Sequence, residues 1–246
     1  MQRLPSCRGL LLPNDNRRSV VTSRLFEAFL ACPRKCYLLS KDEAPAGTEY
    51  SAWAAAREES YRHEIFRKLK SQEPGPDIAS AEPSFWKHES WRFTIGKTVR
   101  TDSWEAEIAL IQRVSQAEAQ SLFVPIRFAA KNRLTASDKT MAAFEAISLA
   151  KALDTKIGAA KIVHGENQST FSVNAAALSR AVHRKVSLVA SLLSAVSPPD
   201  TVLNRHCAEC GFHDQCRKTA VDKDELSLLS SLTDKERTRY RGKGIL

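Results

Sequence analysis

The 246-residue sequence has no apolar run that approaches the roughly 18 residues of a membrane-spanning helix. Its N-terminal region contains a run of only three leucines, at residues 10–12, which is too short and too interrupted for a signal peptide. Internal repeats and low-complexity tracts are also absent from the sequence. These absences argue against membrane-spanning, secreted and repeat proteins. We therefore expect a cytoplasmic protein whose thiols stay reduced.

Acidic residues are fewer than basic ones. The chain has 37 Lys and Arg against 28 Asp and Glu, which gives a formal net charge of +9 and a pI near 9.4. A protein this basic favours polyanionic partners, and nucleic acid is the commonest of these. The hydrophobic content of 43% and the charged content of 26% are ordinary for a globular protein long enough to bury a full core.

Cysteine is scarce, but half of the six cysteines lie in one short segment. Two residues separate Cys207 from Cys210, and five separate Cys210 from Cys216. Thiolates at such spacing bind zinc or an iron–sulfur cluster, and either centre takes a fourth ligand. The other cysteines are all near the N-terminus: Cys7, Cys32 and Cys36. We expect Cys32 to complete the site across about 175 residues of chain.

Two other interpretations of these cysteines stay open at this point. His206 or His213 could supply the fourth ligand of a local zinc site without the N-terminal region. The cysteines could also be unliganded core residues, although they lie in a polar, turn-rich segment. A disulfide framework is not expected, because the sequence has no secretory context.

The apolar patterns predict an α/β fold. Thr22 or Ser23 can cap a first helix, and Pro33 should break it, so that Cys32 lies at a helix junction. Further helices are expected at about 52–70, 137–153 and 175–196, and strands at 91–96, 104–114, 123–128, 161–164 and 170–173. We expect a poorly ordered segment at 1–20, one domain over 21–221, and a charged helical tail at 222–246.

Several segments together resemble a known group of nucleases. They are the stretch from Ser23 to Lys35 with its Cys-Pro-Arg-Lys, Ile162-Val-His-Gly165, the cysteine segment 207–216, and Asp224-Glu-Leu-Ser with Lys243-Gly-Ile. This set resembles the iron–sulfur nucleases of the RecB-like branch of the PD-(D/E)XK superfamily, which includes CRISPR adaptation exonucleases and AddB-type domains. The resemblance also suggests that the tail begins a longer architecture.

The resemblance implies a restriction-endonuclease-like core, in which a small mixed sheet is flanked by helices. It implies a [4Fe-4S] cluster, with zinc as the alternative, that fastens the helical periphery. The ligands would be the four cysteines proposed above: Cys32, Cys207, Cys210 and Cys216.

The same resemblance implies hydrolysis of DNA with Mg²⁺ or Mn²⁺. His63, Glu105 and Glu107 would be the metal ligands. The catalytic residues would be His63, Glu107 and Lys131. Without such a role, His63 belongs to a solvated helix face on which Glu64 and Lys68 pair.

The sequence departs from the family at the third catalytic motif. Where Glu-x-Lys is expected, the strand reads Val124-Pro-Ile-Arg127, and the Gln-x-x-Tyr pattern that follows in many relatives is missing. Two functions therefore stay open: a metal-dependent exonuclease, or a catalytically degenerate module that binds DNA or recruits a partner. The expected partners are single-stranded DNA or DNA with free ends, and a helicase or RNase H-like nuclease. A zinc-stabilised interaction protein with no nucleic-acid role is a third possibility.

Overall fold

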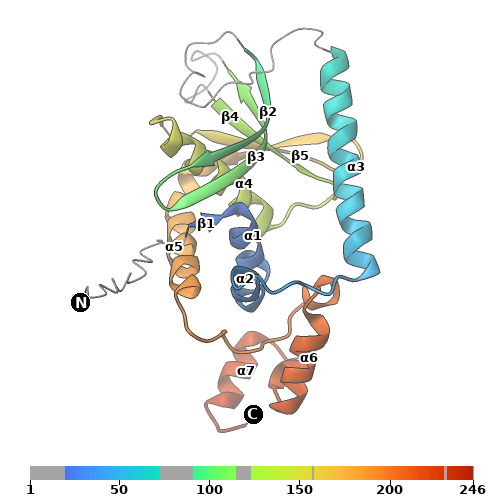
Figure 1. The fold of residues 1–246 in the computed structure, drawn as a ribbon, viewed down its shortest axis with the longest axis vertical. Helices are drawn as coiled ribbons and strands as arrows, with labels where there is room; N and C mark the ends of the chain where they lie inside the picture. The colour runs from blue at the N-terminus through green and yellow to red at the C-terminus, as the bar shows by residue number, and fades with distance from the viewer. Residues whose placement is uncertain (1–19, 73–90, 115–122, 157, 230–231, 246) are drawn as a thin grey trace, which may run out of the picture.

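The computed structural model describes residues 20–72, 91–114, 123–156, 158–229 and 232–245. In this part of the chain the protein is of the α/β class, with a mixed six-stranded sheet and seven α-helices (Figure 1). The predicted α/β class and small mixed sheet are confirmed. Residues 1–19 of the segment expected to be poorly ordered lie outside the described residues.

Five strands form the body of the sheet. β2 (Phe93–Arg100), β3 (Trp104–Arg113) and β4 (Phe123–Ala129) are antiparallel neighbours in the order β2, β3, β4. β5 (Ala159–His164) runs parallel to β4, and β6 (Ser169–Asn174) forms an antiparallel hairpin with β5. The pattern of β-branched and aromatic residues thus located each of these strands to within a few residues.

The sheet has a gap along one edge of β3, between the sixth strand, β1 (Val21–Thr22), and β4. β1 pairs in parallel with the start of β3, whereas β4 pairs with its end, from Leu110 to Arg113. Because β2 covers the other edge of β3, β1 and β4 must share this edge. Between them, the Glu107 backbone N–H donates to Ser23 Oγ at 3.0 Å. A two-residue strand is too short for a sequence pattern, and β1 was not predicted.

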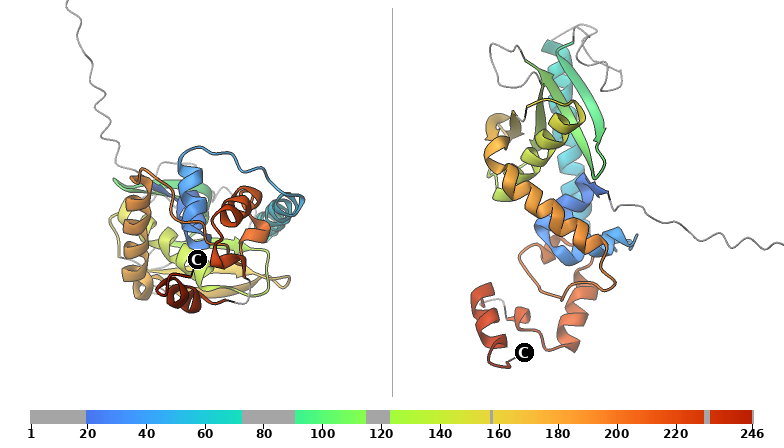
Figure 2. Two further views of the ribbon diagram at one scale, coloured as in Figure 1. Left: turned by 90° about the horizontal axis from the view of Figure 1, so that it is seen from below. Right: turned by 90° about the vertical axis from the view of Figure 1, so that its left-hand side faces the viewer.

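Three helices cover one face of the sheet: α1 (Ser23–Ala31), α4 (Ala136–Ala152) and α5 (Ala175–Leu193) (Figures 1 and 2). The main core lies between them and the sheet, where the rings of Phe26 and Phe144 stack with centroids 4.4 Å apart. Much of α4 is buried, because its many alanines allow close packing on both sides.

The long α3 (Glu49–Gln72) packs on the opposite face. Its Tyr61, Ile65 and Leu69 are four residues apart, so they share the helix face that packs on the sheet. The helix begins three residues before the expected start at residue 52. The cause is a reciprocal cap, in which Thr48 Oγ1 accepts from the Ser51 N–H at 3.0 Å and Ser51 Oγ accepts from the Thr48 N–H at 2.8 Å.

The predicted helix junction at Cys32 is present. Thr22 Oγ1 caps α1 by accepting from the Leu25 N–H at 3.2 Å. Cys32 then takes an extended conformation, and Pro33 occupies the first turn of α2 (Pro33–Ser40), where its missing N–H costs nothing. The side chain at position 32 is thereby fixed between two helices.

The C-terminal part of the described chain lies beyond α2, at the far end of the molecule from the sheet (Figure 2). It contains a 3₁₀ turn (Cys207–Glu209), α6 (His213–Asp222), a second 3₁₀ turn (Leu226–Leu228) and α7 (Asp234–Arg241). α7 lies in the tail for which a helix was predicted. Among the described helices, none is both long and apolar enough to span a bilayer.

Candidate functional site

Four cysteines from opposite ends of the chain line one cavity. Cys32 comes from the α1–α2 junction, and Cys207, Cys210 and Cys216 come from the segment that begins at the first 3₁₀ turn. All four thiols are free and half-buried. The cavity has a volume of about 30 Å³, and its walls also include Arg34 and Thr201.

Main-chain and side-chain contacts fix the positions of these thiols. The Cys32 N–H donates to the Ala28 carbonyl at 2.8 Å and so ends α1. Asn204 connects the two halves of the site. Its backbone N–H donates to Cys207 Sγ at 3.2 Å, and its side-chain Nδ2 donates to the Ala31 carbonyl at 3.3 Å.

The two chain segments are also held together by contacts that do not involve the thiols. Arg34 Nη1 donates to the Pro199 carbonyl at 2.8 Å, and the Tyr37 hydroxyl donates to the Val196 carbonyl at 2.9 Å. Tyr37 also belongs to a small apolar cluster with Leu38 of α2 and Phe212. The protein itself therefore brings the N-terminal and C-terminal cysteines together.

Gly211 allows a third segment to approach this site. Its carbonyl accepts from the Ala46 N–H at 3.0 Å, in the loop before α3. A Cβ added at residue 211 would lie 2.6 Å from the Cβ of Pro45 and 3.0 Å from the backbone nitrogen of Gly47. Only glycine permits this contact without a shift of the backbone.

Burial raises the pKa of two of the thiols that line the cavity and of the nearby Cys36. It raises the pKa of Cys207, although the hydrogen bond from Asn204 opposes the rise. It also raises the pKa of Cys216, against the opposing charge of Arg34. Burial together with the nearby Cys32 raises the pKa of Cys36 to about 12. Cys36 is therefore a protonated core residue, and it does not line the cavity.

The cavity presents sulfur donors from both parts of the chain. Tetrahedral zinc with Zn–S bonds of about 2.3 Å brings its sulfurs to about 3.8 Å from one another. Within the described residues, no three Cys, His, Asp or Glu side chains lie close enough together for one ion. Four thiols around one cavity are donors of the type that bind zinc or an iron–sulfur cluster. His206 and His213, the alternative zinc ligands, also line the cavity.

A second feature is a groove of about 940 Å³ that begins beside the cysteine cavity, with Ala31 and Lys35 in the walls of both. It extends along the gap in the sheet, where Glu107, Ile108 and Ala109 of β3 form part of its wall. Residues of α1, α3, β4 and α4 complete the lining.

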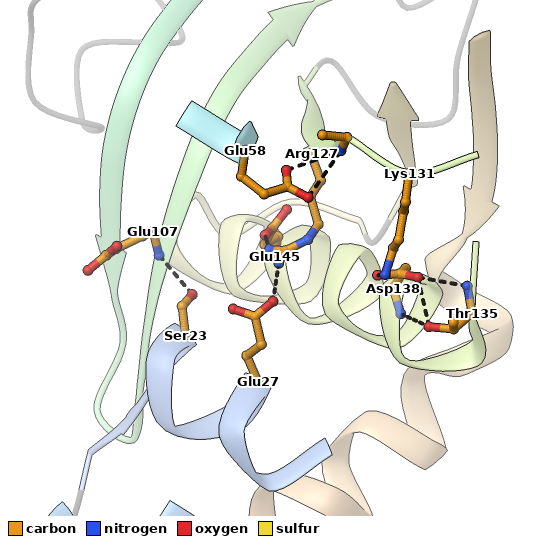
Figure 3. A network of polar contacts seen from close by, with 10 residues as sticks. Ser23, Glu27, Glu58, Glu107, Arg127, Lys131, Thr135, Asp138 and Glu145 are labelled. Carbon is orange, nitrogen blue, oxygen red and sulfur yellow. Dashed lines mark hydrogen bonds and ion pairs between the residues drawn. The ribbon is translucent and has the colours of Figure 1, made fainter. Parts of the chain in front are cut away.

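Arg127 on β4 carries the central charge of the groove. Its Nη1 donates to Glu145 of α4 at 2.7 Å, and its Nη2 donates to Glu27 of α1. Figure 3 shows carboxylates from α1, α3 and α4 gathered around this strand. Glu145 is only 2% exposed, and its Oε2 is buried without a hydrogen-bond partner among the described residues.

Arg127 and Glu145 each shift the pKa of the other. Burial raises the pKa of Glu145, and the attraction of Arg127 opposes the rise. Burial alone would lower the pKa of Arg127, but the charges of Glu145 and Glu27 outweigh it and raise that pKa. Arg127 is therefore a permanent cation, and Glu145 depends on it for charge compensation.

Two further carboxylates in the groove have partners of their own. Asp138 pairs with Lys131 Nζ at 2.7 Å and accepts from Thr135 (Figure 3). Burial would raise the pKa of Asp138, but these hydrogen bonds lower it overall. Glu58 on α3 accepts from the Ala130 backbone N–H at 3.1 Å with both oxygens.

The structure brings only some of the predicted catalytic residues together. Glu107 and Lys131 line the groove. Glu105 pairs with Arg100 at 2.6 Å and is not part of the lining, and His63 lies on the exposed face of α3 outside it. The helical carboxylates were missed by sequence reasoning: Glu27, Glu58, Asp138 and Glu145. A signal was available for Glu145, because a lone acid between Phe144 and Ala146 stands out in an apolar helix.

Comparison with known proteins does not assign the chain to a family. No protein-family model matches the sequence, and a search of curated proteins finds no match. Nine chains in solved structures match. One of them, described as the crystal structure of SSO0001, has a TM-score of 0.42 and 12% identity, over 82% of this chain and 87% of that one.

The buried ion pair predicts a large and pH-dependent loss of stability in Arg127→Gln. The substitution leaves the Glu145 charge buried without a counter-ion, which should cost about 3–5 kcal/mol at pH 8. Because burial then raises the Glu145 pKa without opposition, stability is retained at low pH and lost as the pH rises through that pKa. The deficit should therefore shrink towards pH 5, as measured by urea unfolding.

Arg100→Gln is the matched control. The Arg100 side chain is 76% exposed in its pair with Glu105, so its loss should cost only about 0–1 kcal/mol. A deficit in Arg127→Gln that grows on acidification would contradict the assignment.

Proposed function

We propose that this chain is a nucleic-acid-binding domain of the RecB-like nuclease type. It carries a structural [4Fe-4S] cluster and binds single-stranded DNA or DNA with free ends. The observation that carries the proposal is the meeting of Cys32 with Cys207, Cys210 and Cys216 around one cavity that adjoins a long groove. The cluster would fasten α1 and α2, which form one side of that groove, to the C-terminal segment.

The donor set supports iron over zinc. Four thiolates that line one cavity can ligate a four-iron cluster without a histidine ligand. When bound, such a cluster supplies a rigid anionic link between the chain ends and can exchange one electron. The residues of the cavity supply its ligands and its shielding from solvent.

The charges of the groove support phosphate binding. Four of its five acids already have partners, because Glu27 and Glu145 bind Arg127, Asp138 binds Lys131, and Glu58 binds a backbone N–H. Three basic side chains of the lining have no acidic partner among the described residues: Arg24, Lys35 and Arg62. The groove therefore presents net positive charge to a ligand, as a nucleic-acid backbone requires.

The groove does not fit a catalytic Mg²⁺ or Mn²⁺. Two acids that could act as ligands are bound by Arg127, and no group of three metal-binding side chains lies together within the described residues. Among the lining carboxylates, only that of Glu107 has neither a basic side chain nor an N–H group as partner within the described residues. A single carboxylate cannot hold a hard divalent cation tightly. We therefore assign binding, not phosphodiester hydrolysis, to this groove.

Iron analysis tests the cluster. Protein purified without oxygen should be brown and contain about four irons per chain with little zinc. Cys32→Ser should lose the colour and most of the iron, because it removes the ligand from the N-terminal segment. Cys36→Ala, His206→Ala and His213→Ala are the controls and should keep them. A colourless, zinc-loaded protein that loses its metal in either histidine variant would favour the local zinc site.

DNA binding tests the groove. The triple variant Arg24→Gln, Lys35→Gln, Arg62→Gln should bind a labelled single-stranded oligonucleotide more weakly in fluorescence anisotropy. The slope of log affinity against log salt should fall by about 2, at about 0.7 for each lost phosphate contact.

The matched control changes three basic residues of α5 that do not line the groove: Arg180→Gln, Arg184→Gln and Lys185→Gln. It alters the net charge equally and should leave affinity within about twofold of wild type. Equal losses in both variants would indicate a general charge effect and contradict a binding groove.

A nuclease assay separates binding from cutting. With Mg²⁺ or Mn²⁺, we expect no digestion of end-labelled single-stranded or double-stranded DNA above a metal-free blank, because Arg127 neutralises the helical carboxylates. Metal-dependent digestion that disappears in Glu107→Ala or His63→Ala would show instead that the catalytic assignment from the resemblance holds.

A further inference from the structure

Two polar groups in the wall of the cysteine cavity lack partners. Arg34 Nε and Thr201 Oγ1 are both buried and have no hydrogen-bond partner among the described residues. The Thr201 residue is only 3% exposed. A buried donor without an acceptor costs about 1–3 kcal/mol, so two of them facing one cavity require an explanation.

The orientation of Arg34 is fixed by another contact. Its Nη1 donates to the Pro199 carbonyl at 2.8 Å, which holds the planar guanidinium in place. The side chain therefore cannot turn its remaining N–H groups to solvent without breaking that bond. The charge of Arg34 and its side-chain hydrogen bond to Cys216, near the start of α6, both oppose the rise in the pKa of that thiol.

The chemistry of the missing acceptor follows from the other walls. The cavity is lined by four cysteines, and no carboxylate is among its lining residues. Arg34 and Thr201 are thus donors that face sulfur. Thiolates and inorganic sulfides of a cluster are anionic acceptors that would satisfy both, whereas a single zinc ion brings no sulfide of its own.

We propose that Arg34 and Thr201 are the residues that set the reduction potential of the cluster, by donating hydrogen bonds to its sulfurs. This inference rests on the iron–sulfur site of the proposed function. A cluster gains negative charge when it accepts one electron, so a buried cation and two donors stabilise the reduced form. They raise the reduction potential and make the cluster easier to reduce.

The test is a potentiometric titration of the iron-loaded protein, followed by its visible absorption and by the EPR signal of the reduced cluster. In Arg34→Gln, the ratio of reduced to oxidised cluster at a fixed potential should fall at least tenfold, which is about 59 mV for one electron. Thr201→Val removes one neutral donor at nearly constant volume and should lower the ratio about threefold.

Arg217→Gln is the matched control. Arg217 follows Cys216 directly, but it is exposed and does not line the cavity, so solvent and salt screen its charge. It should leave the ratio within twofold of wild type. Arg34→Lys keeps the charge but not the Nε–H, and it should lie between wild type and Arg34→Gln.

The outcomes separate the two proposals. Wild type without iron overturns the cluster and this inference together. Iron-loaded wild type with an unchanged ratio in Arg34→Gln and Thr201→Val overturns the inference alone. If Arg34→Gln does not fold, Thr201→Val decides: a threefold fall supports the assignment, and an unchanged ratio contradicts it.

Discussion

The helix break at Cys32 and Pro33 is the constraint on which both candidate sites depend. Because α1 must end there, Cys32 points from a fixed junction towards the C-terminal segment, and Lys35 in the first turn of α2 reaches both the cavity and the groove. On its other side, α1 is fastened to α4 through Arg127, which binds Glu27 and Glu145. A single short helical pair thus positions the cysteine site and one wall of the groove.

The buried charges of the groove are paired with one another, whereas several of its exposed basic side chains are not paired with an acid within the described residues. At its base, Arg127 and Glu145 compensate each other where an isolated charge would be costly. Such a pair seldom stabilises a fold more than apolar packing does, but the loss of either partner leaves an uncompensated buried charge. Towards solvent, Arg24 and Arg62 have no acidic partner among the described residues and remain available to an anion. Rigidity at the base and binding charge at the rim are separate consequences of one arrangement.

Much of the fold could be predicted from local patterns, and much of the groove could not. Pro33 predicted the junction, and the apolar patterns predicted five of the six strands of the described sheet. The two cysteine segments were matched because their residue types are rare and chemically specific. By contrast, strand alternation could place Glu105 and Glu107 on one face without showing that only Glu107 reaches the groove. That difference arises from the gap between β1 and β4, which depends on pairing across more than 80 residues.

The close approach at Gly211 has a mechanical consequence for α3. The residues around Pro45 rest directly on the cysteine segment, and α3 begins only a few residues later. Farther along, the same helix holds Glu58 and Arg62 against the groove. The contact at Gly211 therefore fixes where the helix that carries Glu58 and Arg62 begins relative to the cysteine segment.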